Sequence, residues 1–144
     1  MQTFKKVGAV VAGFVVATVI MLIFEWINHW LFPKPASLDV MNAAAVQAFT
    51  ASLPWTAYIL VFLGWAVGAF EGACTTSWLA REKVFRSSAV LAAILMLAGI
   101  FDMWMLGFPP VFTLIGLVFL AVFPYLGHRT LLWYEAKKRA QMAA

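Results

Sequence analysis

The sequence predicts an all-α protein, a bundle of four transmembrane helices with both termini cytoplasmic and a short interfacial helix in the first outer loop. Of its 144 residues, 65% are hydrophobic and only 11% are charged, and the mean hydropathy is +0.93. A water-soluble domain of this length could not cover its surface with so few charges. Because a spanning helix needs about 20 apolar residues, the chain has room for four spans in a single membrane domain.

Four apolar runs define the spans, and polar or basic segments separate them. We expect the spans at residues 7–32, 54–80, 87–108 and 111–133. An outer loop then covers 33–53, a basic cytoplasmic loop covers 81–86, and a cytoplasmic tail covers 134–144. The sequence GFPP before the last span predicts a tight turn, because Pro109 and Pro110 cannot continue the preceding helix. The first run is too long for the apolar part of a signal peptide, so we expect an uncleaved first helix.

The outer loop contains a helix signal of its own. Asp39 can cap a helix over about residues 40–52, because an aspartate side chain accepts hydrogen bonds from first-turn N–H groups. The segment MNAAAVQAF supplies good helix formers. Its larger apolar residues fall near one face, so we expect a short helix that lies on the outer membrane interface.

The placement of basic residues predicts the orientation of the bundle. Of the 10 Lys and Arg residues, Lys34 alone falls on the outer side, and the other nine fall on the side that carries both termini. Such an asymmetry is typical of the positive-inside rule. Most tryptophans lie near predicted span ends, as in aromatic belts. Trp65 is the exception, and we expect it to be used for packing or lipid contact.

The second span carries a glycine stripe in GWAVGAFEG, formed by Gly64, Gly68 and Gly72. In lipid, small residues allow the close backbone approach that holds helices together. The stripe therefore predicts a tight helix–helix contact, either within the chain or with a second copy. The segment GAVVAG, residues 8–13, is the candidate facing surface within the chain.

Glu71 lies in the same span and is an intramembrane carboxylate. At 100° per residue it is about 20° from Gly64 and about 60° from Gly68, so we expect it to point into the helix contact. An ionisable residue inside a span is a functional hypothesis by default. The alternative is a neutral carboxyl group that hydrogen-bonds to a neighbouring carbonyl or threonine.

A second group of polar residues lies near the outer surface. The sequence FEWINHW places Glu25 and His29 one helical turn apart, so we expect them to interact. At ~1.5 Å per residue, Glu25 and Asp102 lie at similar depths, about 8–9 Å from the outer ends of their spans. A cluster of Glu25, Asn28, His29 and Asp102 is therefore predicted, with Glu71 at a separate, inner level.

Two interpretations of this cluster stay open. It is a polar clamp at a wet outer rim, or it is a site that binds a proton or a cation. Two ligands from the first span and Asp102 would suit Zn²⁺, but spacing alone is weak evidence, and we predict no metal and no cofactor. His128 falls at the inner end of the fourth span and cannot join this cluster.

The chain resembles a group of small bacterial four-helix integral membrane proteins that have no assigned activity. The resemblance rests on Glu25 and His29, on LFPKPASLD, LPWTA and GWAVGAFEGA, and on the proline turn. In that group a glycine tends to stand in place of Glu71, an asparagine in place of Asp102, and a histidine–proline pair in place of Phe108–Pro109. The resemblance implies the four-helix fold and a bacterial inner membrane. It implies no substrate and no catalytic residue.

Three classes of function fit these observations. We favour a non-catalytic membrane protein that packs with itself or with a membrane protein partner. The second class is a small proton- or cation-linked transporter or channel that uses Glu25, His29, Glu71 and Asp102. The third is a membrane enzyme or metal protein, but no catalytic motif such as GxSxG or HExxH is found and we predict no catalytic residue. We expect the lipid bilayer as the surroundings and no nucleic-acid partner.

Overall fold

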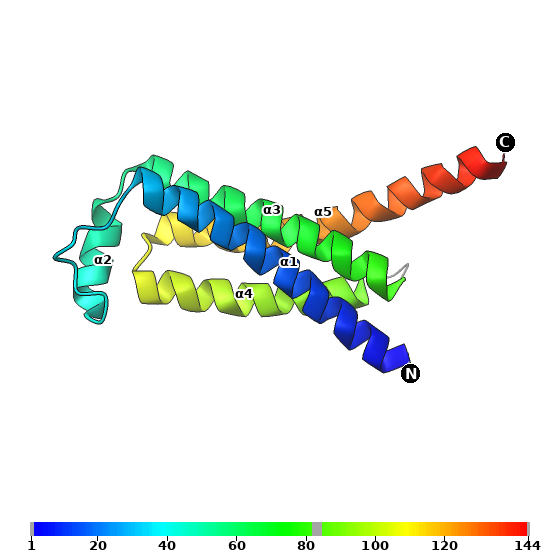
Figure 1. Cartoon of the computed structure of the whole chain (residues 1–144), viewed down its shortest axis with the longest axis horizontal. Coiled ribbons are helices and arrows are strands. Elements are labelled where there is room, and N and C mark those ends of the chain that lie inside the picture. The colour runs from blue at the N-terminus through cyan, green and yellow to red at the C-terminus, as the bar shows by residue number, and fades with distance from the viewer. Residues whose placement is uncertain (1, 82–84, 144) are drawn as a thin grey trace.

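The structure is a computed structural model that describes residues 2–81 and 85–143. The described residues form five α-helices (Figure 1), which are α1 (Gln2–Leu31), α2 (Ala43–Ser52), α3 (Trp55–Ala80), α4 (Arg86–Leu106) and α5 (Pro110–Ala143). All except α2 are long and apolar enough to cross a membrane, which suggests an integral membrane protein. Lys83 of the predicted basic loop and Ala144 of the predicted tail lie outside the described residues.

The four long helices run antiparallel to their chain neighbours, so both chain ends lie at one end of the bundle (Figure 1). We call this the terminal end. The short helix α2 crosses the opposite end, beside the turn between α4 and α5 (Figure 1). We call this the α2 end. A helix in the predicted outer loop is therefore present at the end of the bundle opposite the termini.

Helix α3 lies at the centre of the bundle and packs most extensively against α1. A Cβ atom added at Gly68 would lie 2.8 Å from the carbonyl oxygen of Ala17, and one added at Gly72 would lie 2.7 Å from that of Gly13. These spacings leave no room for a side chain. The glycine stripe of α3 thus lets two backbones touch within one chain.

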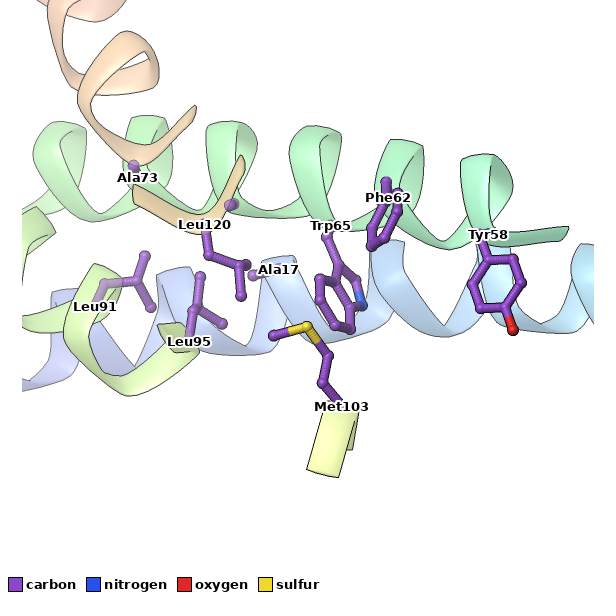
Figure 2. Close-up of a cluster of buried hydrophobic side chains, with 10 residues drawn as sticks. Ala17, Tyr58, Phe62, Trp65, Ala73, Leu91, Leu95, Met103 and Leu120 are labelled. Atoms are coloured by element: carbon purple, nitrogen blue, oxygen red, sulfur yellow. The ribbon is translucent and has the colours of Figure 1, made fainter. Parts of the chain in front are cut away.

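The face of α3 next to the glycine stripe carries the large core side chains. Figure 2 shows Tyr58, Phe62 and Trp65 spaced along α3, with Met103 of α4 reaching toward Trp65. The Trp65 side chain is only 5% exposed, and its ring lies parallel to that of Phe108 with centroids 6.3 Å apart. Trp65 is therefore a packing residue rather than a lipid contact.

The start of α2 differs from the sequence expectation. The N-cap is Asn42, whose side chain accepts hydrogen bonds from the N–H groups of Ala44 and Ala45. Asp39 instead accepts from the N–H group of Met41 at 3.0 Å and closes a turn before the helix begins. The prediction of Asp39 as the cap is wrong because both Asx side chains can cap, and the chain uses the second.

Two other helix ends show how backbone chemistry fixes the connections. Helix α4 ends at Gly107, whose φ of +66° is the left-handed conformation that glycine adopts readily. The N–H group of Phe108 then donates to the carbonyl oxygen of Met103 at 3.0 Å, and Pro110 begins α5. Helix α5 continues past Trp133 because the polar residues that follow are good helix formers, with Glu135 and Arg139 paired at 3.4 Å.

Candidate functional site

A cavity of about 620 Å³ lies at the α2 end of the bundle. Its walls come from the end of α1, the loop after it, the start of α3 and the end of α4, and α2 covers it. Its apolar lining residues include Phe32, Leu38, Val46, Phe49, Leu53, Val61, Trp65, Leu106 and Phe108. Its polar lining residues include Glu25, Asn28, His29, Lys34, Thr50 and Tyr58. Apolar walls with a few polar groups are typical of small-molecule sites, and so is this volume.

Specific hydrogen bonds hold α2 over this cavity. The Tyr58 hydroxyl donates to the carbonyl oxygen of Thr50 at 2.6 Å, which ties α2 to the start of α3. The Gln47 side chain donates to the carbonyl oxygen of Met105 at 3.4 Å. A Cβ atom at Gly107 would lie only 2.7 Å from Cγ of Gln47, so the glycine also makes room for this contact. Helix α2 is thus fixed to α3 and to the α4–α5 turn.

The last turns of α1 supply the polar wall. The face of α1 that meets α3 contains Gly13, Ala17 and Phe24, and Asn28 continues that face. Asn28 Oδ1 is buried and has no hydrogen-bond partner among the described residues. An unpaired buried acceptor is costly, so it favours a hydrogen-bond donor at this position.

Glu25 and His29 lie beside this face rather than on it. Both side chains line the cavity, but both are also exposed at the outside of the bundle. The described hydrogen bonds include none between them. We also expected both side chains to face the bundle interior, and this is corrected, because the α3-facing stripe of α1 leaves both residues to one side. Their interaction, directly or through one water, stays a prediction.

Asp102 of α4 lies close enough to Glu25 for the two carboxylates to act on each other electrostatically. Asp102 is exposed and stands beside the cavity rather than in its lining. The structure thus brings Glu25, Asn28 and His29 together at the cavity, with Asp102 next to Glu25. Within the described residues, no group of three His, Cys, Asp or Glu side chains is placed to hold a metal ion, so the zinc alternative lacks the required geometry.

Glu71 lies outside this cavity and its side chain is exposed. The expectation that it points into the helix contact is wrong. The buried arc of α3 begins at Gly64 and continues through Trp65 to Ala66, whereas Glu71 lies on the opposite side of Gly64. Glu71 is only about 20° from Gly64 around the helix axis, but it lies on the side of Gly64 that is turned away from the buried arc.

A buried polar cluster at the terminal end was not predicted from the sequence. The Ser77 hydroxyl lies 2.7 Å from the Ser88 hydroxyl and 2.8 Å from Nδ1 of His128. The His128 side chain is 3% exposed, and Ser88 donates to the carbonyl oxygen of Ala73 at 3.3 Å. These contacts join α3, α4 and α5. The available signal was the matching depth of three polar residues in neighbouring spans, and their mutual hydrogen bonds are suited to fixing the bundle.

Sequence reasoning also missed the apolar part of the cavity. Tyr58 and Trp65 are ordinary span residues by pattern, and nothing local indicates that α2 folds over them. The usable signal was Tyr58 itself, since a buried tyrosine hydroxyl needs a hydrogen-bond partner from another element. That partner is the backbone of Thr50.

Comparison with protein-family models, with curated proteins and with solved structures finds no match for this chain. The resemblance to small bacterial four-helix membrane proteins thus gains no support from a family model. The function has to be argued from the site itself, because a helix bundle can carry many functions.

Proposed function

We propose that this chain is a non-catalytic integral membrane protein that binds a cationic amphiphile in the cavity at the α2 end. The observation that carries the proposal is the cavity of about 620 Å³, with apolar walls and acceptor groups gathered on one wall. An apolar tail would be stabilised by contact with the apolar walls, and a charged or hydrogen-bonding head would be stabilised by the acceptor groups. The lipid bilayer is the natural source of such a molecule.

The polar wall favours a cationic head that donates hydrogen bonds. Glu25 lines the cavity, and Asp102 lies near enough to Glu25 to add to the negative charge around it. Asn28 Oδ1 adds a buried acceptor without a partner among the described residues. Lys34 also lines the cavity, from the loop that follows α1. An ammonium group satisfies these acceptors better than a carboxylate or a phosphate does.

The tail would lie between α2 and the start of α3. Val46 and Phe49 of α2 and Val61 of α3 line this part of the cavity, and Trp65 is the lining residue furthest along α3. The Tyr58 hydroxyl is already used by Thr50, so it does not need the ligand. The tail environment is therefore largely apolar, and Glu25, Asn28 and His29 on the α1 wall are the polar groups proposed to meet the head.

Ligand-dependent stabilisation tests the proposal. In phosphatidylcholine nanodiscs, decylammonium should raise the thermal unfolding midpoint of the parent more than decanoate of equal chain length does, because only the cation suits Glu25. Glu25→Gln should remove most of that difference. Val46→Trp should remove it by filling the cavity with an indole ring. Glu135→Gln, which removes a carboxylate at the terminal end, is the matched control and should behave like the parent.

Equal stabilisation of all four proteins by the cation would show partition into the lipid and would contradict a site. Equal effects of decylammonium and decanoate on the parent would contradict the role of the acceptor wall. Val46→Trp and Glu25→Gln change different parts of the site, so a folding defect in one leaves the other as a test.

We also propose that the terminal end faces the cytoplasm of a bacterial cell and that the chain lies in its inner membrane. The support is that nine of the 10 Lys and Arg residues fall in segments expected at that side. Loops rich in these residues tend to stay in the cytoplasm. Reporter fusions at Gln2 and Ala144 should both give cytoplasmic signals. A periplasmic signal from either fusion would contradict this orientation.

A further inference from the structure

The side of α5 that faces away from the bundle carries basic and aromatic residues at the terminal end. Gly127 lies against the backbone of α3, and His128 beside it is buried. At 100° per residue, Trp133 is about 120° from Gly127 and about 140° from His128, so it lies on the side turned away from α3. Arg129 and Lys137 stand one turn before and one turn after Trp133 on that same side. We call Arg129, Trp133 and Lys137 the outer stripe.

The outer stripe is exposed, and its positive charge is not balanced by a carboxylate. The Trp133 side chain is 64% exposed, and Arg129 and Lys137 are exposed as well. Lys137 Nζ lies 5.3 Å from the centre of the Trp133 ring, and neither basic residue forms an ion pair within the part of the chain that the structure describes. Glu135, the one acidic residue in the sequence of α5, pairs with Arg139 and lies about 160° round the helix from Trp133.

The outer stripe continues an apolar surface of the same helix. Val118, Val122 and Leu126 precede it on this side of α5, and their side chains are 42–50% exposed. Val122 and Leu126 each lie about 20° from Trp133 round the helix axis. In a spanning helix an exposed apolar side faces lipid tails, so the change to Arg129 and Trp133 marks the headgroup level. Figure 1 shows the last part of α5 leaving the other helices here, which opens the stripe to the membrane surface.

We propose that the outer stripe binds the phosphate of an anionic phospholipid whose acyl chains lie along Val122 and Leu126. Arg129 can donate two hydrogen bonds to phosphate oxygens, and Lys137 adds a second positive charge. Their Cα atoms are about 12 Å apart along the helix, and both side chains are long enough to meet at the level of Trp133. The indole N–H group can donate to an ester carbonyl between the phosphate and the tails.

A zwitterionic headgroup suits the outer stripe less well than an anionic one. Phosphatidylcholine would bring its own trimethylammonium group close to Arg129 and Lys137, and like charges repel. The Trp133 ring could attract that group, but Lys137 already lies over the ring. An exposed tryptophan that continues a lipid-facing surface also favours a lipid over an acidic soluble protein, because tryptophan is enriched at the membrane–water interface.

Lipid retention by the full chain tests this inference. The protein in neutral detergent is mixed with equal amounts of phosphatidylglycerol and phosphatidylcholine of the same chain length, and bound lipid is counted by native mass spectrometry. The parent should retain phosphatidylglycerol in preference. Arg129→Gln together with Lys137→Gln should weaken that binding on the order of tenfold, because two cations near the phosphate are lost. Lys5→Gln together with Lys138→Gln removes the same charge from exposed positions outside the stripe and should change it less than about twofold.

Further variants separate a defined site from general attraction to a basic surface. Trp133→Ala keeps both cations but removes the indole, and it should lower phosphatidylglycerol retention. Trp78→Ala is its matched control, because the Trp78 side chain at the same end is 62% exposed but belongs to α3. Arg129→Lys together with Lys137→Arg keeps the charges and should bind like the parent.

Equal retention of the two lipids by the parent would overturn the proposal and would favour an acidic protein partner for the outer stripe. Equal losses in the stripe and control double variants would also overturn it, since the binding would then follow total charge. Full retention in Trp133→Ala would do the same, because the proposed site includes the indole.

Discussion

Gly68→Leu is expected to separate α1 from α3 and to destabilise the bundle by about 3 kcal/mol, because the new side chain enters a backbone contact. Even its Cβ atom would lie 2.8 Å from the Ala17 carbonyl oxygen and 3.0 Å from Cγ of Met21. A backbone oxygen cannot move aside as a flexible side chain can. Thermal unfolding in detergent, followed by circular dichroism, measures the loss.

Gly8→Leu is the matched control for this substitution. Gly8 lies in the same helix pair, but a Cβ atom added there meets nothing within 4 Å. The same glycine-to-leucine change should therefore leave the unfolding midpoint of the Gly8 variant close to that of the parent. If both variants unfolded at the same temperature, the glycine stripe would have no special role in joining α1 to α3.

Trp65→Ala should lower the free energy of unfolding by about 3–5 kcal/mol, the largest loss that we expect from truncating a single side chain in this core. The indole is 5% exposed and is packed against Phe62 and Phe108. It also lies against Gly116 of α5, where an added Cβ atom would be 3.0 Å from the ring. Its removal leaves a space between three helices that small shifts cannot fill.

Trp104→Ala provides the comparison, because the Trp104 side chain is 75% exposed and contacts the core little. We expect its midpoint in detergent to fall far less than that of Trp65→Ala. Similar losses in the two variants would mean that Trp65 is not a core residue. Because Trp65 lines the inner end of the cavity, Trp65→Ala should also allow an alkylammonium with a chain longer than decyl to bind.

Composition and the lengths of the apolar runs were sufficient to predict the helical fold. The four apolar runs correspond to the four long helices because each run is long enough to cross a bilayer and is bounded by turn or basic residues. Gly107 and the prolines after it mark the α4–α5 turn for local reasons of backbone conformation. The predicted span ended at Trp133, whereas α5 continues to Ala143. Hydropathy marks the part of a helix that can lie in lipid, but polar residues that favour helix formation continue α5 beyond that part.

The candidate site was predictable only in part. The similar depth of Glu25 and Asp102 follows from helix rise alone, and the two carboxylates do act on each other. To predict where the Glu71 side chain points, one must know which side of Gly64 meets a neighbouring helix. A single sequence does not contain that information. The cavity needed the docking of α2 by Tyr58 and Gln47, which are contacts between distant segments.

The most direct test of the central claim is photochemical mapping of where a cationic amphiphile binds. A decyl ammonium probe with a diazirine in its chain is irradiated with the full protein in phosphatidylcholine nanodiscs, and labelled residues are identified by mass spectrometry. The account predicts labels concentrated on cavity residues such as Val46, Val61 and Phe108, and their loss in Glu25→Gln. Labels spread over the exposed outward faces of the long helices, for example at Leu63 and Leu97, and unchanged in Glu25→Gln, would contradict it.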